Sequence, residues 1–128
     1  MRKFLAGLAA LAFMVALVAP LTAAPETVTG KVIDQMCFMK DKTNNTGADH
    51  KMPADTAGCA LACAKLGRPM ALLTTDGKVY TLKGGLAENM NAKLQPHVAH
   101  TVSITGEVMK EKDGSMSIAA AELKMVSR

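Results

Sequence analysis

The residues best suited to chemistry gather in one stretch of this chain of 128 residues. The stretch holds all three cysteines, Cys37, Cys59 and Cys63, and one of the three histidines, His50. Cys59 and Cys63 are four residues apart, so on a helix their thiols would lie on one face, about one turn apart. Three cysteines and one histidine are sufficient for a tetrahedral metal site. We therefore expect these four side chains to bind one metal ion together.

Zinc is the metal expected first, because it suits this ligand set and has no redox chemistry. Copper(I) is expected second, because it also prefers thiolate and imidazole. Met36, Met39 and Met52 lie near the ligands and could each lend a thioether, although core packing is the favoured interpretation for a methionine. Asp34 could hydrogen-bond the ring of His50 and so orient it. It could equally be a turn residue that ends a strand.

The N-terminus predicts export from the cytoplasm. Two basic residues, Arg2 and Lys3, precede an uncharged apolar stretch, and small residues follow a proline. This order is typical of a secretory signal peptide, here residues 1–24. The apolar stretch is shorter than the roughly 20 residues of a membrane-spanning helix. We expect residues 25–128 to form one periplasmic or secreted domain, with no membrane span after cleavage.

Export makes the odd number of cysteines informative. Exported proteins usually pair their cysteines, and three cysteines leave one thiol over. A shared metal ion uses all three, so a metal site is the favoured interpretation. Two alternatives stay open: a thiol–disulfide redox protein that uses Cys59 and Cys63, and a non-catalytic binding module whose long loop is stapled by cysteines.

No motif identifies an enzyme, so catalysis stays open and a non-catalytic role is favoured. Neither a Ser-His-Asp pattern, nor a carboxylate pair, nor a glycine-rich phosphate loop is visible. The spacing Cys59-x-x-x-Cys63 differs from the Cys-x-x-Cys of thioredoxin-like oxidoreductases. His97 and His100 flank the expected start of a strand, and we expect them at the surface rather than among the ligands.

Charge and aromatic content argue against nucleic acid as a partner. The formal net charge of +4 falls to about +2 without Arg2 and Lys3, which is too weak to attract a polyanion strongly. Phe38 and Tyr80 are the only aromatic residues after residue 24, so platforms for stacking bases are missing. Which protein or small ligand the chain would meet stays open.

Short runs of strand-forming residues between turn signals predict five strands. The expected strands are residues 28–33, with a bend or bulge at Gly30, then 70–74, 78–82, 101–109 and 116–126, the last bulged near its three alanines. Turns through Asp76-Gly77 and Asp113-Gly114 are expected to join two pairs of strands into hairpins.

Helical propensity appears in two further segments. Residues 59–66 are expected to form a helix that Gly67 ends, and residues 86–94 a second, short one. Residues 34–58 are expected to be an irregular loop, which is uncommon at this length unless something clamps it. A metal ion or a disulfide would supply the clamp.

Five short strands with glycine bends predict a fold that is mainly β, with one or two short helices. A small five-stranded barrel of the OB type is expected, with the clamped loop after its first strand. A small β-sandwich is the alternative.

One pattern of residues runs through nearly the whole chain after residue 24. In order, it consists of Gly30, Asp34, Cys37, His50, Cys59-Ala60, Cys63, Gly67, Pro69, Leu72-Leu73-Thr74, Asp76-Gly77-Lys78, Tyr80, Val102 and Ile104-Thr105-Gly106. With this pattern, the chain resembles a group of small exported bacterial proteins of uncharacterised function. The resemblance implies a single OB-like barrel, with the cysteines and the histidine as the shared polar signature. It implies no known reaction.

Overall fold

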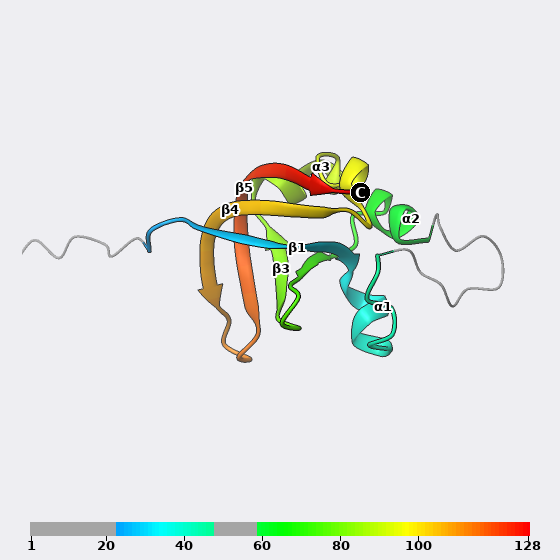
Figure 1. Cartoon of the computed structure of the whole chain (residues 1–128), viewed down its shortest axis with the longest axis horizontal. Coiled ribbons are helices and arrows are strands. Elements are labelled where there is room, and N and C mark those ends of the chain that lie inside the picture. The colour runs from blue at the N-terminus through cyan, green and yellow to red at the C-terminus, as the bar shows by residue number, and fades with distance from the viewer. Residues whose placement is uncertain (1–22, 48–58) are drawn as a thin grey trace, which may run out of the picture.

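The computed structural model describes residues 23–47 and 59–128 (Figure 1). In chain order the elements are β1 (Glu26–Asp34), α1 (Gln35–Lys40), α2 (Cys59–Lys65), β2 (Met70–Leu73), β3 (Val79–Lys83), the 3₁₀ turn η2 (Gly85–Ala87), α3 (Glu88–Asn91), the 3₁₀ turn η3 (Gln95–His97), β4 (Thr101–Lys110) and β5 (Met116–Ser127). All but the last two positions of the expected signal peptide lie outside the described residues. Within the described ranges, no helix is long and apolar enough to cross a membrane.

The five strands form one mixed sheet that closes on itself in the order β1-β2-β3-β5-β4. Strands β3 and β5 run parallel, and the other described pairs are antiparallel. The protein is therefore mainly β with a few short helices, and the five expected strands are confirmed. The strands form one sheet that closes in a ring, and not the two separate sheets that the sandwich alternative requires.

Strand β1 closes the ring by changing partners along its length. Its first part pairs with β4, and its last part pairs with β2, with Lys31 in register with both Leu73 and Thr101. Gly30 lies at this crossing, where a Cβ atom would be 2.6 Å from the carbonyl oxygen of Leu73. The glycine that predicted a bend is thus required by a close approach of two backbones.

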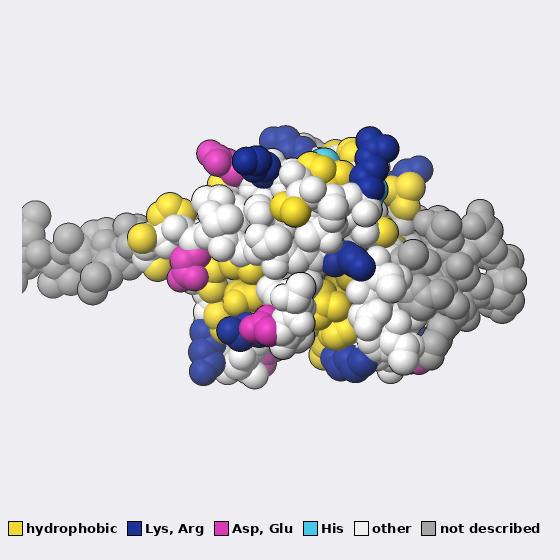
Figure 2. All heavy atoms as spheres, viewed as in Figure 1, with side chains coloured by type: hydrophobic (Ala, Val, Ile, Leu, Met, Phe, Trp, Pro, Cys, Tyr) yellow, Lys and Arg dark blue, Asp and Glu magenta, His cyan; other side chains and the backbone are white. Residues whose placement is uncertain are grey.

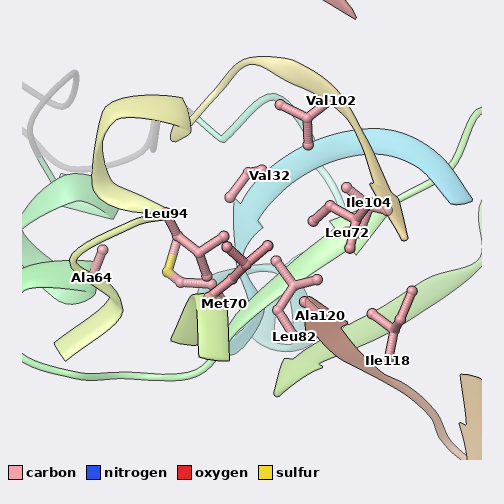
Figure 3. Packing of buried hydrophobic residues seen from close by; sticks show 11 residues of the cluster. Val32, Ala64, Met70, Leu72, Leu82, Leu94, Val102, Ile104, Ile118 and Ala120 are labelled. Carbon is pink, nitrogen blue, oxygen red and sulfur yellow. The ribbon is translucent and has the colours of Figure 1, made fainter. Parts of the chain in front are cut away.

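The core fills the inside of the ring. Val32, Leu72, Ile104 and Ile118 are fully buried there and belong to one cluster (Figure 3). Burying each such side chain stabilises the fold by roughly 1.5–3 kcal/mol. The cluster also includes Ala64 of α2, so this helix is attached to the core by its own buried face.

Both predicted hairpins are present. Gly77 and Gly114 have φ angles of +84° and +86°, which only glycine adopts without strain. The predicted bulge is also found: Thr105 pairs with Glu122 but Gly106 pairs with Ala120. One of the three alanines of β5 is therefore left out of the register, and the strand bends around the ring.

The expectation of an irregular loop directly after β1 was wrong. Residues Gln35–Lys40 form the helix α1. Asp34 starts it, because its carboxylate accepts the first backbone N–H groups of the helix. Residues 48–58 of the expected loop lie outside the described residues.

The expected helix over residues 86–94 is broken. Asn89, Met90 and Asn91 have φ angles of +51°, +56° and +58°, so three successive residues adopt the left-handed conformation. Asparagine tolerates this conformation better than most residues. The side chain of Asn91 is buried and bonded to α2, so a tertiary contact overrides helical propensity here.

The surface carries charges of both signs. In Figure 2 the Lys and Arg side chains are spread over the visible face, with Asp and Glu side chains among them. This distribution agrees with the small net charge of the chain.

Candidate functional site

Strand pairing brings α1 and α2 to the same end of the ring. Asp34, the last residue of β1, is in register with Met70, the first residue of β2. The chain leaves β1 into α1 and enters β2 from α2, and the two helices lie at the same end of the sheet (Figure 1). The N–H of Gln35 also donates to the carbonyl oxygen of Pro69 at 3.3 Å. The segments that carry Cys37 and Cys63 are therefore neighbours.

Cys37 and Cys63 line one pocket of about 350 Å³ between these segments. The other lining residues are Asp34, Gln35, Met36, Met39, Lys40, Arg68 and Pro69. Four of these nine lining residues contain sulfur, and both cysteines are half-buried. Such a wall can bind a soft metal ion, or its thiols can be oxidised.

The backbone of Cys37 is held on both sides. Oδ1 of Asp34 accepts the N–H of Met36 at 2.9 Å and the N–H of Cys37 at 3.3 Å. The carbonyl oxygen of Cys37 accepts the N–H of Asp41 at 3.0 Å and the side-chain amide of Asn44 at 3.1 Å. The cysteine is thus fixed although α1 has only six residues.

The backbone of Cys63 is fixed by the way α2 ends. The N–H of Gly67 donates to Ala64 at 2.9 Å, and the N–H of Arg68 donates to the carbonyl oxygen of Cys63 at 3.1 Å. With Gly67 at a φ of +72°, this is a Schellman ending. Asn91 then donates to the carbonyl oxygens of Ala64 and Arg68, at 3.0 and 2.9 Å.

Asp34 presents an unsatisfied carboxylate oxygen in this region. The residue is 2 % exposed. Its Oδ1 caps α1, whereas its Oδ2 is buried and has no hydrogen-bond partner among the described residues. Gln35 lines the same pocket, and its Oε1 is also buried without a hydrogen-bond partner among the described residues. Buried acceptors without donors are costly, so a cation or a donor group in the pocket would stabilise them.

Packing is the wrong interpretation for two of the three methionines. Met36 and Met39 are 45 % and 61 % exposed. Sδ of Met36 lies 3.5 Å from Nη1 of Arg68, and Sδ of Met39 lies 3.4 Å from Nζ of Lys42. Met52 lies outside the described residues. The two exposed thioethers line the pocket wall rather than filling the core.

Two of the four expected ligand side chains lie outside the part of the chain that the structure describes. His50 lies outside the described residues, and so does the side chain of Cys59, although α2 begins at Cys59 as expected. Among the residues that are described, no three His, Cys, Asp or Glu side chains are grouped closely enough to hold a metal ion. The structure thus brings together Cys37, Cys63 and Asp34 around one pocket and leaves the complete ligand set as a prediction.

His97 and His100 form a pair away from the pocket lining. Their ring centroids are 6.3 Å apart with the rings edge to face, and both residues are half-buried. Burial, and to a lesser degree the charge of His100, lowers the pKa of His97. The expectation that these histidines are surface residues is therefore only partly met.

Arg68, Lys40 and Gln35 were not anticipated as part of the site. Arg68 could have been suspected, because it stands between the helix-ending Gly67 and Pro69, where the chain turns back to β2. For Lys40 and Gln35 the necessary signal was the helix α1, which the sequence pattern did not reveal.

The chain matches no protein-family model, no curated protein and no solved structure.

Proposed function

We propose that the protein is a small exported metal-binding module with Cys37, His50, Cys59 and Cys63 as ligands, for zinc or a soft ion such as copper(I). The observation that carries this proposal is the buried Oδ2 of Asp34 at the pocket that two cysteines line, because this atom has no hydrogen-bond partner in the part of the chain that the structure describes. A cation in the pocket would compensate this negative charge, whereas a disulfide would not.

Asp34 has a defined part in this proposal. Its Oδ2 would accept the N–H of the His50 ring and so fix which ring nitrogen binds the ion. Carboxylates commonly orient metal-binding histidines in this way. Because Oδ1 is already committed to the cap of α1, the carboxylate would link the metal to the end of β1.

We also propose that the ring is a barrel of the OB type. Its support is the strand order, the parallel pairing of β3 with β5 and the helical segment between β3 and β4. In OB folds the connection between the first two strands often takes part in ligand binding. The candidate site lies in that connection.

Export is part of the proposal as well. The order of basic, apolar and small residues before residue 25 supports it. Strand β1 begins at Glu26, so removal of residues 1–24 would leave every described strand intact. Outside the cytoplasm a bound ion would also protect thiols that are otherwise open to oxidation.

A titration of the mature protein with zinc and with copper(I), against a chelator of known affinity, tests the metal site. Wild type should bind one equivalent, and Cys37→Ser and Cys63→Ser should each lose at least about tenfold in affinity. His50→Ala should also weaken binding, while His97→Ala and His100→Ala serve as matched controls and should bind normally. Wild-type binding by every cysteine variant would overturn the proposal.

A thiol–disulfide redox protein is the second candidate. The shared pocket wall of Cys37 and Cys63 favours it over a plain binding module, although the couple expected from the sequence is Cys59 with Cys63. Intact masses before and after reduction distinguish the two candidates, because a disulfide gains two hydrogens on reduction and a metal site does not.

A further inference from the structure

We infer that the ion is copper(I), and that Met36 and Met39 form the path by which it enters and leaves the pocket. This inference rests on the proposed function, because it assumes that Cys37 and Cys63 bind the ion. It adds the identity of the ion and a role as cargo instead of a permanent structural centre.

The first support is that the side chains of α1 lie on two sides of the helix, one against the sheet and one at the pocket. Phe38 is buried in a small cluster with Ile33 and Ala71. Met36 and Met39, one helical turn apart, line the pocket on the other side. The aromatic side chain of the helix thus packs against the sheet, and its sulfur-containing side chains line the pocket.

The second support is the exposure of the two methionines. Met36 and Met39 are exposed, whereas Cys37 and Cys63 of the same wall are half-buried. An exposed methionine gives up the stabilisation that full burial of its side chain would provide. Sulfur ligands at two depths would let an ion pass from the solvent to the cysteines.

The third support is the chemistry of the thioether. Soft sulfur ligands select copper(I), whereas zinc sites in proteins use thiolate, imidazole and carboxylate. A zinc site would therefore use the cysteines of this pocket and leave both methionines without a role. Copper(I) gives all four sulfur-containing residues of the wall a function.

The fourth support is the charge around the pocket. Arg68 and Lys40 line it, and Lys42 contacts the sulfur of Met39. Copper(I) bound by the three proposed thiolates keeps a net charge of −2, whereas zinc bound by the same three thiolates keeps a net charge of −1. Cationic groups around the pocket favour the more negative copper(I) complex.

The test compares Met36→Leu/Met39→Leu with Met90→Leu in the mature protein. Met90 is 64 % exposed, lies on α3 and does not line the pocket, so it is a matched control. Each protein is loaded anaerobically with copper(I), and transfer of the ion to a bathocuproine chelator is followed by absorbance. The double variant should change the transfer rate or the copper(I) affinity by at least about tenfold. Met90→Leu should match wild type.

The outcomes separate this inference from the metal site itself. If the double variant binds and transfers copper(I) as wild type does, or if wild type takes zinc but not copper(I), the inference is overturned and the metal site stands. If Cys37→Ser and Cys63→Ser bind both ions as wild type does, the proposed function fails. Zinc affinity should be the same in the double variant, which also shows that the variant is folded.

Discussion

Oδ1 of Asp34 lies 3.3 Å from the backbone nitrogen of Cys37. One residue therefore ends β1, starts α1 and fixes the first cysteine of the site. Its second carboxylate oxygen has no hydrogen-bond partner within residues 23–47 and 59–128. Oδ1 of Asp34 serves the fold, and Oδ2 is proposed to serve metal binding. Substitutions can therefore test the two oxygen atoms separately.

Asp34→Asn and Asp34→Ala should differ in a defined way. Asparagine keeps an oxygen for the cap, so the metal-free protein should stay nearly as stable as wild type. Alanine removes the cap and should cost about 1 kcal/mol of unfolding free energy in urea. Both variants lose the charge at Oδ2, and both should weaken metal binding by roughly 10- to 100-fold. Wild-type metal affinity in Asp34→Asn would contradict the role given to Oδ2.

Asn91→Ala should show how firmly α3 holds the end of α2. The change removes the donors to the carbonyl oxygens of Ala64 and Arg68. Asn89→Ala is the matched control, because Asn89 shares the left-handed backbone but is exposed. Left-handed alanine costs about 1–2 kcal/mol in either variant, and the two buried carbonyls should add about 1–3 kcal/mol to Asn91→Ala alone. Equal unfolding free energies of the two variants would show that the bonds contribute nothing.

Gly67→Ala tests the Schellman ending that fixes Cys63. At a φ of +72° the substitution should cost about 1–2 kcal/mol of unfolding free energy. An added Cβ would meet Met90 only at 3.6 Å, so the cost is conformational and not a clash. Gly85→Ala is the control, because a Cβ there meets no described atom within 4 Å and its φ is not in the left-handed range. If both variants unfold at the same urea concentration, the ending does not act as described.

The pH dependence of stability should report on His97. Its pKa is lowered in the folded protein, first by burial and then by His100. The unfolded chain therefore takes up this proton at a higher pH than the folded protein, and stability falls as the pH drops through the ordinary histidine value of about 6.5. Urea unfolding of the metal-free protein from about pH 7.5 to about pH 5.5 should show this fall. His97→Gln should flatten it, and an unchanged slope in His97→Gln would assign the fall to other groups.

Local turn chemistry explains why much of the fold could be predicted. Asp76-Gly77 and Asp113-Gly114 carry their hairpin signals within two residues, and each glycine has the expected positive φ. By contrast, α1 is six residues long, which is too short to show a helical period. Its start signal, Asp34, also ends a strand and so was open to another interpretation.

Part of the candidate site could also be predicted from the sequence. Residue type was enough to group Cys37 with Cys63, because cysteines are few. The exposure of Met36 and Met39 was not predictable, because it depends on which side of α1 packs against the sheet. Phe38 lies on the packed side, and the two methionines lie on the other side. The broken helix at Asn91 depends on contacts with α2, which are distant in sequence.

The most direct test of a metal-binding function is the native mass of the protein isolated from the exported fraction. We predict a chain that begins near residue 25 and carries one metal ion, which is lost in Cys37→Ser. A folded, metal-free chain that gains two hydrogens on reduction would contradict the metal site and favour the redox alternative.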